Sequence, residues 1–148
     1  LKFFLLKVDP QKRMLFNPEE SIDLQGDTGP FVQYTFARIK SMFRAADSAE
    51  LNAKANVFEA KESELALMKV LMNYQSVVMK ASQSYSPSLI VSYALDVAKA
   101  FNRVYNDVSF LREPDVNIRK HRLRLAAVTA ETIHQLMMML GIECPERM

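Results

Sequence analysis

Apolar residues that recur every three or four positions constrain this chain more than any other feature. They stand at spacings of 4, 3, 4, 3 and 4 between residues 90 and 108, and of 3, 4, 3, 4 and 3 between residues 123 and 140. Such spacing lines one face of an α-helix. The two sets are Ile90, Ala94, Val97, Phe101, Val104 and Val108, and Leu123, Ala126, Ala130, Ile133, Met137 and Leu140. Each long helix has to bury its apolar face against another element, so the sequence predicts an all-α fold.

Three more helices are expected upstream, over residues 30–46, 62–72 and 74–84. Their expected core residues are Val32, Phe36, Ile39, Phe43 and Ala46 on the first helix, and Leu65, Met68 and Met72 on the second. Thr28 or Gly29 is expected to cap the first helix, with Pro30 in its first turn. Short connections favour antiparallel neighbours, so the expected architecture is a bundle of about five helices.

The N-terminal part of the chain has a different pattern. Residues 1–8 resemble the end of a buried helix, and a short helix capped by Asn17 and a short strand at 14–16 are expected after them. We therefore divide the chain into a connector, residues 1–25, and a helical domain, residues 26–148. The chain begins with Leu1 inside an apolar run, which suggests a piece of a longer protein.

Composition narrows the class of protein. The 148 residues are 49% hydrophobic and 24% charged, which fits one globular domain and excludes disorder. Only three glycines are present, which disfavours glycine-rich nucleotide-binding folds. The net charge is +2, so an argument for nucleic-acid binding has to rest on local clusters. The single cysteine excludes an intrachain disulfide and fits a cytoplasmic protein.

No catalytic or metal-binding constellation is found in the sequence. It has no phosphate-binding glycine loop, and His121 and His134 are 13 positions apart on one expected helix. Cys144 has no base near it in sequence. The uncharged run 81–95 is short and contains Pro87, so no membrane span is expected. The chain itself is therefore expected to hold no cofactor and no metal.

Aromatic residues beside an arginine are the first candidate site. At about 100° per residue, the core face of the helix over 30–46 centres near about 100° from Phe31, whereas Tyr34 and Arg38 lie at about −60° and −20°. Phe31, Tyr34 and Arg38 thus form a second stripe off the core face. Such side chains stack on unpaired bases or meet phosphates. A neighbouring helix could equally cover the stripe. For Tyr105, core packing and an exposed role are both open.

A basic cluster is the second candidate site. Arg119, Lys120, Arg122 and Arg124 fall within six positions, and no acidic residue lies between Val116 and Ala130. The cluster could contact RNA phosphates, or it could be an ordinary solvated helix start. Cations at a helix N-terminus oppose the helix dipole, which favours a ligand for this face.

Four sequence segments resemble those of the C-terminal anticodon-binding domain of bacterial arginyl-tRNA synthetases. They are DTGPFVQYTFAR, SYALDVAKAFNRVY, RLRLAAV and the closing LGIECPERM, and they span essentially the whole chain in order. The resemblance implies a helical bundle that binds the anticodon stem-loop of tRNA(Arg). It also implies that ATP and arginine bind in a catalytic domain N-terminal to Leu1, so this chain would not be catalytic by itself. The parent enzyme would be a cytoplasmic monomer.

The resemblance also assigns residues to the anticodon loop. They are Phe31, Tyr34, Arg38, Tyr105 and Met148. Phe31 stands where many members of the family have tyrosine, so stacking is retained but a hydroxyl hydrogen bond is not. All arginine codons share a middle G, so the base to be read would be the middle C of the anticodon. The alternative from another class of protein is a helical protein-interaction module without RNA binding.

Overall fold

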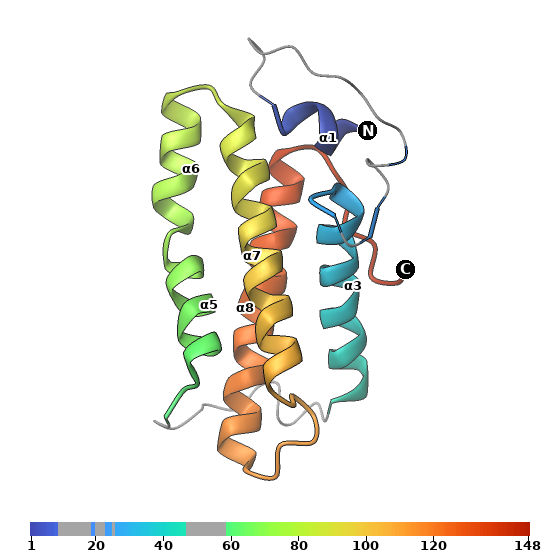
Figure 1. Cartoon of the computed structure of the whole chain (residues 1–148), viewed down its shortest axis with the longest axis vertical. Coiled ribbons are helices and arrows are strands. Elements are labelled where there is room, and N and C mark those ends of the chain that lie inside the picture. The colour runs from blue at the N-terminus through green and yellow to red at the C-terminus, as the bar shows by residue number, and fades with distance from the viewer. Residues whose placement is uncertain (9–18, 20–22, 25, 47–58) are drawn as a thin grey trace.

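All the regular structure described in this chain is helical. A computed structural model describes residues 1–8, 19, 23, 24, 26–46 and 59–148. Its helices are α1 (Lys2–Leu6), α3 (Gly29–Ala45), α5 (Glu62–Met72), α6 (Tyr74–Gln83), α7 (Pro87–Asp107) and α8 (Val116–Met139) (Figure 1). The five longer helices confirm the expected all-α bundle, and α1 lies within residues 1–8, where the end of a helix was expected. The expected strand at 14–16 and the cap at Asn17 lie outside the described residues.

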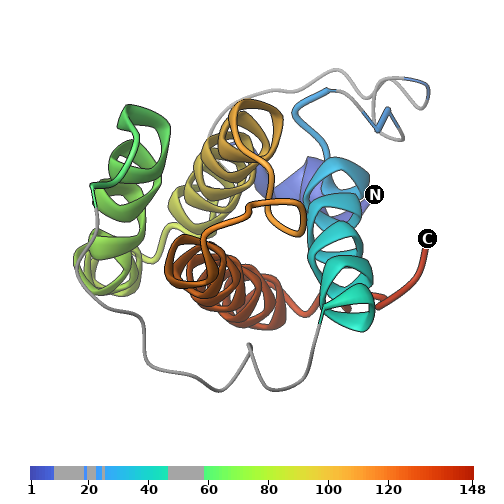
Figure 2. The same cartoon turned by 90° about the horizontal axis from the view of Figure 1, so that it is seen from below.

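Helix α7 is the centre of the bundle. It packs against α1, α3, α5, α6 and α8. Viewed along the bundle, α3 lies on one side of the α7–α8 pair and α5 and α6 lie on the other (Figure 2). Every core residue expected on α7 and α8 is buried. Val91, Leu95 and Ala98 are buried as well, because a helix with neighbours on several sides needs more than one apolar stripe.

The expected core face of α5 is wrong for two of its three residues. Leu65 and Met72 are exposed and Met68 is partly buried against the core, whereas Glu64 and Leu67 are fully buried. The apolar pattern failed here because α5 turns a carboxylate, not only apolar groups, towards the interior. Helix α5 ends at Met72, Asn73 caps it, and α6 continues in the same general direction (Figure 1).

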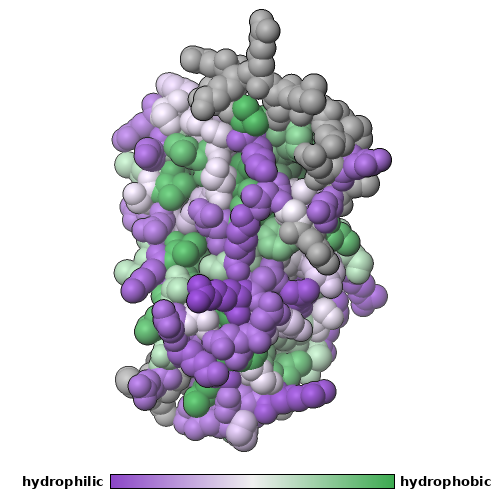
Figure 3. All heavy atoms as spheres, in the orientation of Figure 1, coloured by the Kyte–Doolittle hydropathy of each residue, from purple (hydrophilic) through white to green (hydrophobic). Residues whose placement is uncertain are grey.

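Helix α3 largely follows its expected pattern. Val32, Phe36 and Ile39 are buried, and Phe43 is only partly buried because Met42 fills the corresponding position of the core. The helix ends at Ala45, and Ala46 is its cap. On the face of the molecule in Figure 3, exposed apolar side chains are scattered among hydrophilic ones. No helix in the described part of the chain is long and apolar enough to span a membrane.

Candidate nucleic-acid interface

The start of α3 is fixed by its cap and by α1. The side chain of Thr28 accepts a hydrogen bond from the Phe31 N–H at 3.2 Å and donates one to the carbonyl of Asp23. Thr28 is therefore the cap, and it is buried. A Cβ at Gly29 would lie 3.0 Å from the Cβ of Phe3, so only glycine lets α1 pack this closely. These contacts set the rotation at which α3 presents its second stripe.

The second stripe of α3 is divided between two environments. Tyr34 is 37% exposed and Arg38 is half-buried. Phe31 is partly buried and packs against the hydrophobic core. The sequence left open whether this stripe is covered by a neighbouring element or exposed to a ligand. In the structure Phe31 is partly covered and Tyr34 is exposed. Tyr34 has a ring face that a base could reach, and Phe31 has less of one.

Arg38 lies between two tyrosine rings. Its guanidinium carbon is 4.8 Å from the ring centroid of Tyr34 and 4.8 Å from that of Tyr105, which comes from α7. Such cation–π contacts stabilise the arginine over both rings. We call these three residues the Tyr–Arg cluster. The guanidinium thus contacts both tyrosines, and its remaining N–H groups are the donors left to bind a ligand.

A hydrogen-bond relay orients Arg38. Its Nη1 donates to Oδ1 of Asn102, and Nδ2 of Asn102 donates to Oγ1 of Thr35 at 2.8 Å and to the carbonyl of Ala98 at 2.9 Å. Thr35 in turn donates to the carbonyl of Phe31 at 3.0 Å. Thr35 is fully buried, so the relay is anchored inside the bundle.

Tyr105 lies at the edge of an aromatic group on α7 and the loop that follows. Its ring centroid is 6.2 Å from that of Phe101 and 5.9 Å from that of Phe110. Phe101 and Phe110 are buried, whereas Tyr105 is 39% exposed. Core packing is therefore confirmed for Phe101. Tyr105 therefore packs against the two phenylalanines on one side and is accessible on the other.

A cleft of about 920 Å³ opens beside the Tyr–Arg cluster. It lies between the second half of α3, the loop after α7 and the C-terminal residues. The cleft is lined by four of the five residues that the resemblance assigned to the anticodon loop, namely Tyr34, Arg38, Tyr105 and Met148. Phe31 is not among its lining residues.

The charged side chains of the cleft are all positive. Besides Arg38, its lining includes Arg44, Arg112 and Arg147, and no Asp or Glu side chain. These three arginines were not predicted as site residues, because Arg112 and Arg147 lie outside the expected helices and Arg44 lies outside the stripe of Phe31, Tyr34 and Arg38. Only the fold brings them together. Groups of arginines without carboxylates are typical of surfaces that bind phosphates or carboxylates.

The C-terminal tail reaches the cleft along α3. Helix α8 ends in a Schellman motif: Gly141 has φ 65°, and the Ile142 N–H donates to the carbonyl of Met137 at 2.9 Å. Gln33 then donates to the carbonyl of Glu143 at 2.7 Å. Further along α3, Lys40 pairs with Glu146 at 3.2 Å. These ties place Arg147 and Met148 in the lining of the cleft.

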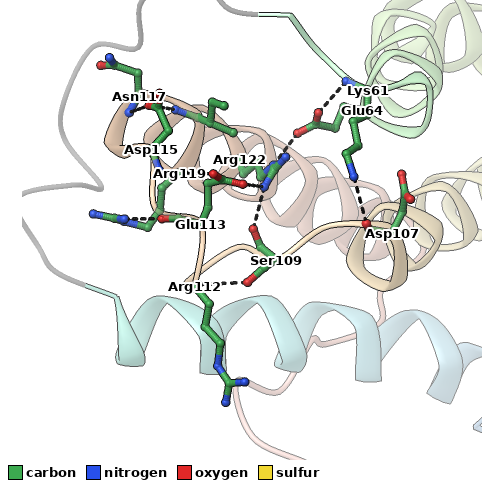
Figure 4. A network of polar contacts seen from close by, with 11 residues as sticks. Lys61, Glu64, Asp107, Ser109, Arg112, Glu113, Asp115, Asn117, Arg119 and Arg122 are labelled. Atoms are coloured by element: carbon green, nitrogen blue, oxygen red, sulfur yellow. Dashed lines mark hydrogen bonds and ion pairs between the residues drawn. The ribbon is translucent and has the colours of Figure 1, made fainter.

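The basic cluster does not form one surface. Arg122 is 5% exposed, its Nε lies 2.9 Å from Oε1 of Glu64, and its Nη1 lies 2.6 Å from Oε2 of Glu113 (Figure 4). The expected role of Arg122 as a surface phosphate contact is therefore wrong. The reason is that α5 and the loop before α8 supply carboxylates that are distant from it in sequence.

The other members of the basic cluster lie away from the cleft. Arg119 donates to the carbonyl of Glu113, and Lys120 is half-buried. Arg124 is exposed beside a separate, mostly apolar groove between α5 and α8. None of Arg119, Lys120 or Arg124 lines the cleft. Their expected contact with RNA phosphates stays a prediction, at a different place from the Tyr–Arg cluster.

Two further titratable groups are turned inward. Burial raises the pKa of the Cys144 thiol to about 11. Burial also lowers the pKa of His121, with Glu64 acting in the opposite direction. A thiol with a raised pKa is a poor nucleophile. Among the described residues, no group of histidine, cysteine and carboxylate side chains could hold a metal ion.

Known proteins are similar to this chain in sequence. A family model described as the DALR anticodon binding domain matches residues 32–148. An arginine–tRNA ligase of Porphyromonas gingivalis is 48% identical over 151 residues, covering 100% of this chain and 25% of that protein. One from Phocaeicola vulgatus is 44% identical over 151 residues, with the same coverage. This chain spans about a quarter of the length of these curated relatives.

Solved structures agree with the sequence relatives. The arginyl-tRNA synthetase of Thermus thermophilus superposes with a TM-score of 0.91 at 30% identity, covering 99% of this chain and 26% of that chain. A Plasmodium falciparum arginyl-tRNA synthetase shares the fold, with a TM-score of 0.82 at 20% identity and coverage of 99% and 26%. Because the family model matches most of the described bundle, this chain belongs to the DALR anticodon binding domain family.

Proposed function

We propose that this chain recognises the anticodon loop of tRNA(Arg) as part of an arginyl-tRNA synthetase, which joins arginine to tRNA with ATP. The observation that carries the proposal is the Tyr–Arg cluster at the wall of a cleft that contains four arginines and no acidic side chain. Aromatic faces and cations in one groove are the groups that bind unpaired nucleotides. The named relatives support tRNA(Arg) as the RNA.

Each member of the cluster has a distinct part in this proposal. The accessible rings of Tyr34 and Tyr105 stack on unpaired bases, and each stacked base contributes about 1–3 kcal/mol. Arg38 contacts both rings and offers the N–H groups that Asn102 does not hold. An arginine N–H edge matches the O2 and N3 acceptors of cytosine, the middle base common to arginine anticodons.

The chemistry of aminoacylation is proposed to lie outside these residues. The sequence has no glycine-rich phosphate loop. The described residues contain no group of side chains arranged for catalysis. We propose that ATP and arginine bind in the catalytic domain of the same parent protein, which acts as a monomer in the cytoplasm. The present chain then contributes the choice of tRNA.

A titration with RNA hairpins tests the proposal. One hairpin carries the anticodon loop of tRNA(Arg), and the other has its middle C replaced by U. We expect tighter binding of the first hairpin and affinity that falls with salt. Equal binding of both hairpins, or no binding at low salt, would contradict the proposal. Binding of a helical protein partner that ignores salt would instead favour the protein-interaction alternative.

A further inference from the structure

Arg112 lies on the wall of the cleft formed by the loop between α7 and α8. The residue is exposed, and its side chain lines the cleft together with Tyr105 and Phe110 from the same wall. We infer that Arg112 binds a backbone phosphate of the RNA loop whose bases meet the Tyr–Arg cluster. This inference rests on the proposed function and adds to it a phosphate-binding residue that the sequence pattern does not indicate.

Two neighbouring charged residues of this loop point in opposite directions. Glu113 is turned inward, where its carboxylate pairs with Nη1 of Arg122 at 2.6 Å. Arg112, its neighbour in sequence, extends the other way, towards α3 and away from the polar network (Figure 4). The carboxylate that would most simply neutralise Arg112 is therefore already occupied by Arg122.

The loop that carries Arg112 is held in place. Nη1 of Arg122 donates to the carbonyl of Ser109 at 2.9 Å, and the backbone N–H of Arg112 donates to Oγ of Ser109 at 3.1 Å. Because Arg122 is itself fixed by the fully buried Glu64, the backbone of the loop is tied to the core. A cation on a fixed backbone loses less conformational entropy when it binds an anion.

Two of the other arginines of the cleft, Arg38 and Arg44, have contacts inside the chain that explain their position, and Arg112 has no such side-chain contact in the described part of the chain. Arg38 lies between two rings and bonds Asn102. Arg44 stands in the last turn of α3, where a cation favours the helix dipole, and donates to the carbonyl of Glu146 at 3.3 Å. Among the described residues, no carboxylate pairs with the side chain of Arg112. An anion brought by the ligand would supply the missing partner.

Phosphate is the anion that fits this place. Arg112 lines the same cleft as the rings proposed to stack on bases, so the backbone of the same nucleotides would pass close to it. Contacts to phosphate position a nucleic acid without reading its sequence. Arg112 should therefore add affinity equally for hairpins with a middle C and hairpins with a middle U.

The test compares the salt dependence of hairpin binding by the 148-residue chain and by its Arg112→Gln variant. For an unpaired strand, removing one phosphate contact lowers the slope of log K against log salt by about 0.7. We expect this decrease, weaker binding at low salt and an unchanged ratio between the two hairpins. Arg112→Lys should keep most of the slope, because lysine remains a point charge for phosphate.

Arg103→Gln is the matched control, since Arg103 is exposed on α7, does not line the cleft and carries the same charge. It should leave the slope unchanged, and the helicity of all variants should match that of the parent chain. If the parent chain discriminates the hairpins but Arg112→Gln keeps its slope, this inference is wrong and the proposed function stands. Loss of discrimination in Arg112→Gln would also overturn it, because a base contact would be indicated. No binding by the parent chain at low salt would overturn both.

Discussion

Nε of Arg122 lies 2.9 Å from Oε1 of Glu64, and both side chains are buried between α8 and α5. Removing one partner of a buried ion pair leaves an uncompensated charge and costs about 3–5 kcal/mol. We therefore expect Arg122→Ala to lower the free energy of unfolding by that amount, measured by urea denaturation. Arg124→Ala, on the exposed side of the same helix, should change it by less than about 0.5 kcal/mol. Equal stability of the two variants would mean that the pair does not form.

The relay from Asn102 to Arg38 leads to a prediction about coupling. Asn102→Ala removes the acceptor of Arg38 Nη1, so the guanidinium is no longer held in one orientation. We expect weaker hairpin binding, and a smaller effect of the same substitution when Arg38 is already alanine. A double-mutant cycle should give a coupling energy of about 0.5–3 kcal/mol.

Asn106→Ala is the control for this cycle. Asn106 is exposed one turn further along α7, and it does not line the cleft. It should leave hairpin binding unchanged. Strictly additive effects of Asn102→Ala and Arg38→Ala would show that Asn102 does not act through Arg38.

The sequence was sufficient for the helices and for part of the site, and the reason is that both are local. Periodicity gave the cores of α7 and α8, and it separated Tyr34 and Arg38 from the apolar face of α3. The meeting of Arg38 with Asn102 could not be predicted from local pattern, because 64 positions separate them. It depends on how α3 and α7 pack.

The failures have the same physical origin. Arg122 is 58 positions from Glu64. The basic cluster therefore has no acidic neighbour along the chain, but the fold brings a carboxylate to Arg122. The same carboxylate disrupted the apolar pattern of α5 and led to the wrong core face there. Arg112 and Arg147 carry no local signal, since one stands in a loop and the other in the tail.

Tyr34 should contribute to RNA binding and little to folding. The residue is 37% exposed, and its ring contacts the guanidinium of Arg38. We expect Tyr34→Ala to weaken hairpin binding by about 1–3 kcal/mol through the loss of one stacked base. Tyr34→Phe keeps the ring and should retain most of the affinity. The far-ultraviolet circular dichroism of Tyr34→Ala should match the parent chain, and a large loss of helicity would show that Tyr34 belongs to the core.

Gly141 should be needed for the turn that sends the tail towards the cleft. Its φ of 65° is left-handed, and an added Cβ would lie 3.1 Å from Nζ of Lys2. Gly141→Ala should lower the free energy of unfolding by about 1–2 kcal/mol, the usual cost of a left-handed L-residue. Gly141→Asn should cost less, because asparagine tolerates this conformation. Urea denaturation of both variants checks this order, and equal costs would contradict it.

Cys144 should react slowly with alkylating reagents as long as the chain is folded. The thiolate is the reactive form, and burial raises the pKa of the thiol from 9.0 to about 11. In the folded chain, the alkylation rate should therefore keep rising with pH up to about 11, whereas in urea it should level off near 9.

The same shift has a consequence for stability. Between the two pKa values the unfolded chain releases the proton first, so this thiol's contribution to stability is complete below pH 9 and is lost as the pH rises towards 11. Cys144→Ser should decline less in stability over that range, because serine does not titrate there. An alkylation profile that levels off at the same pH with and without urea would show that the thiol is not held in the buried position.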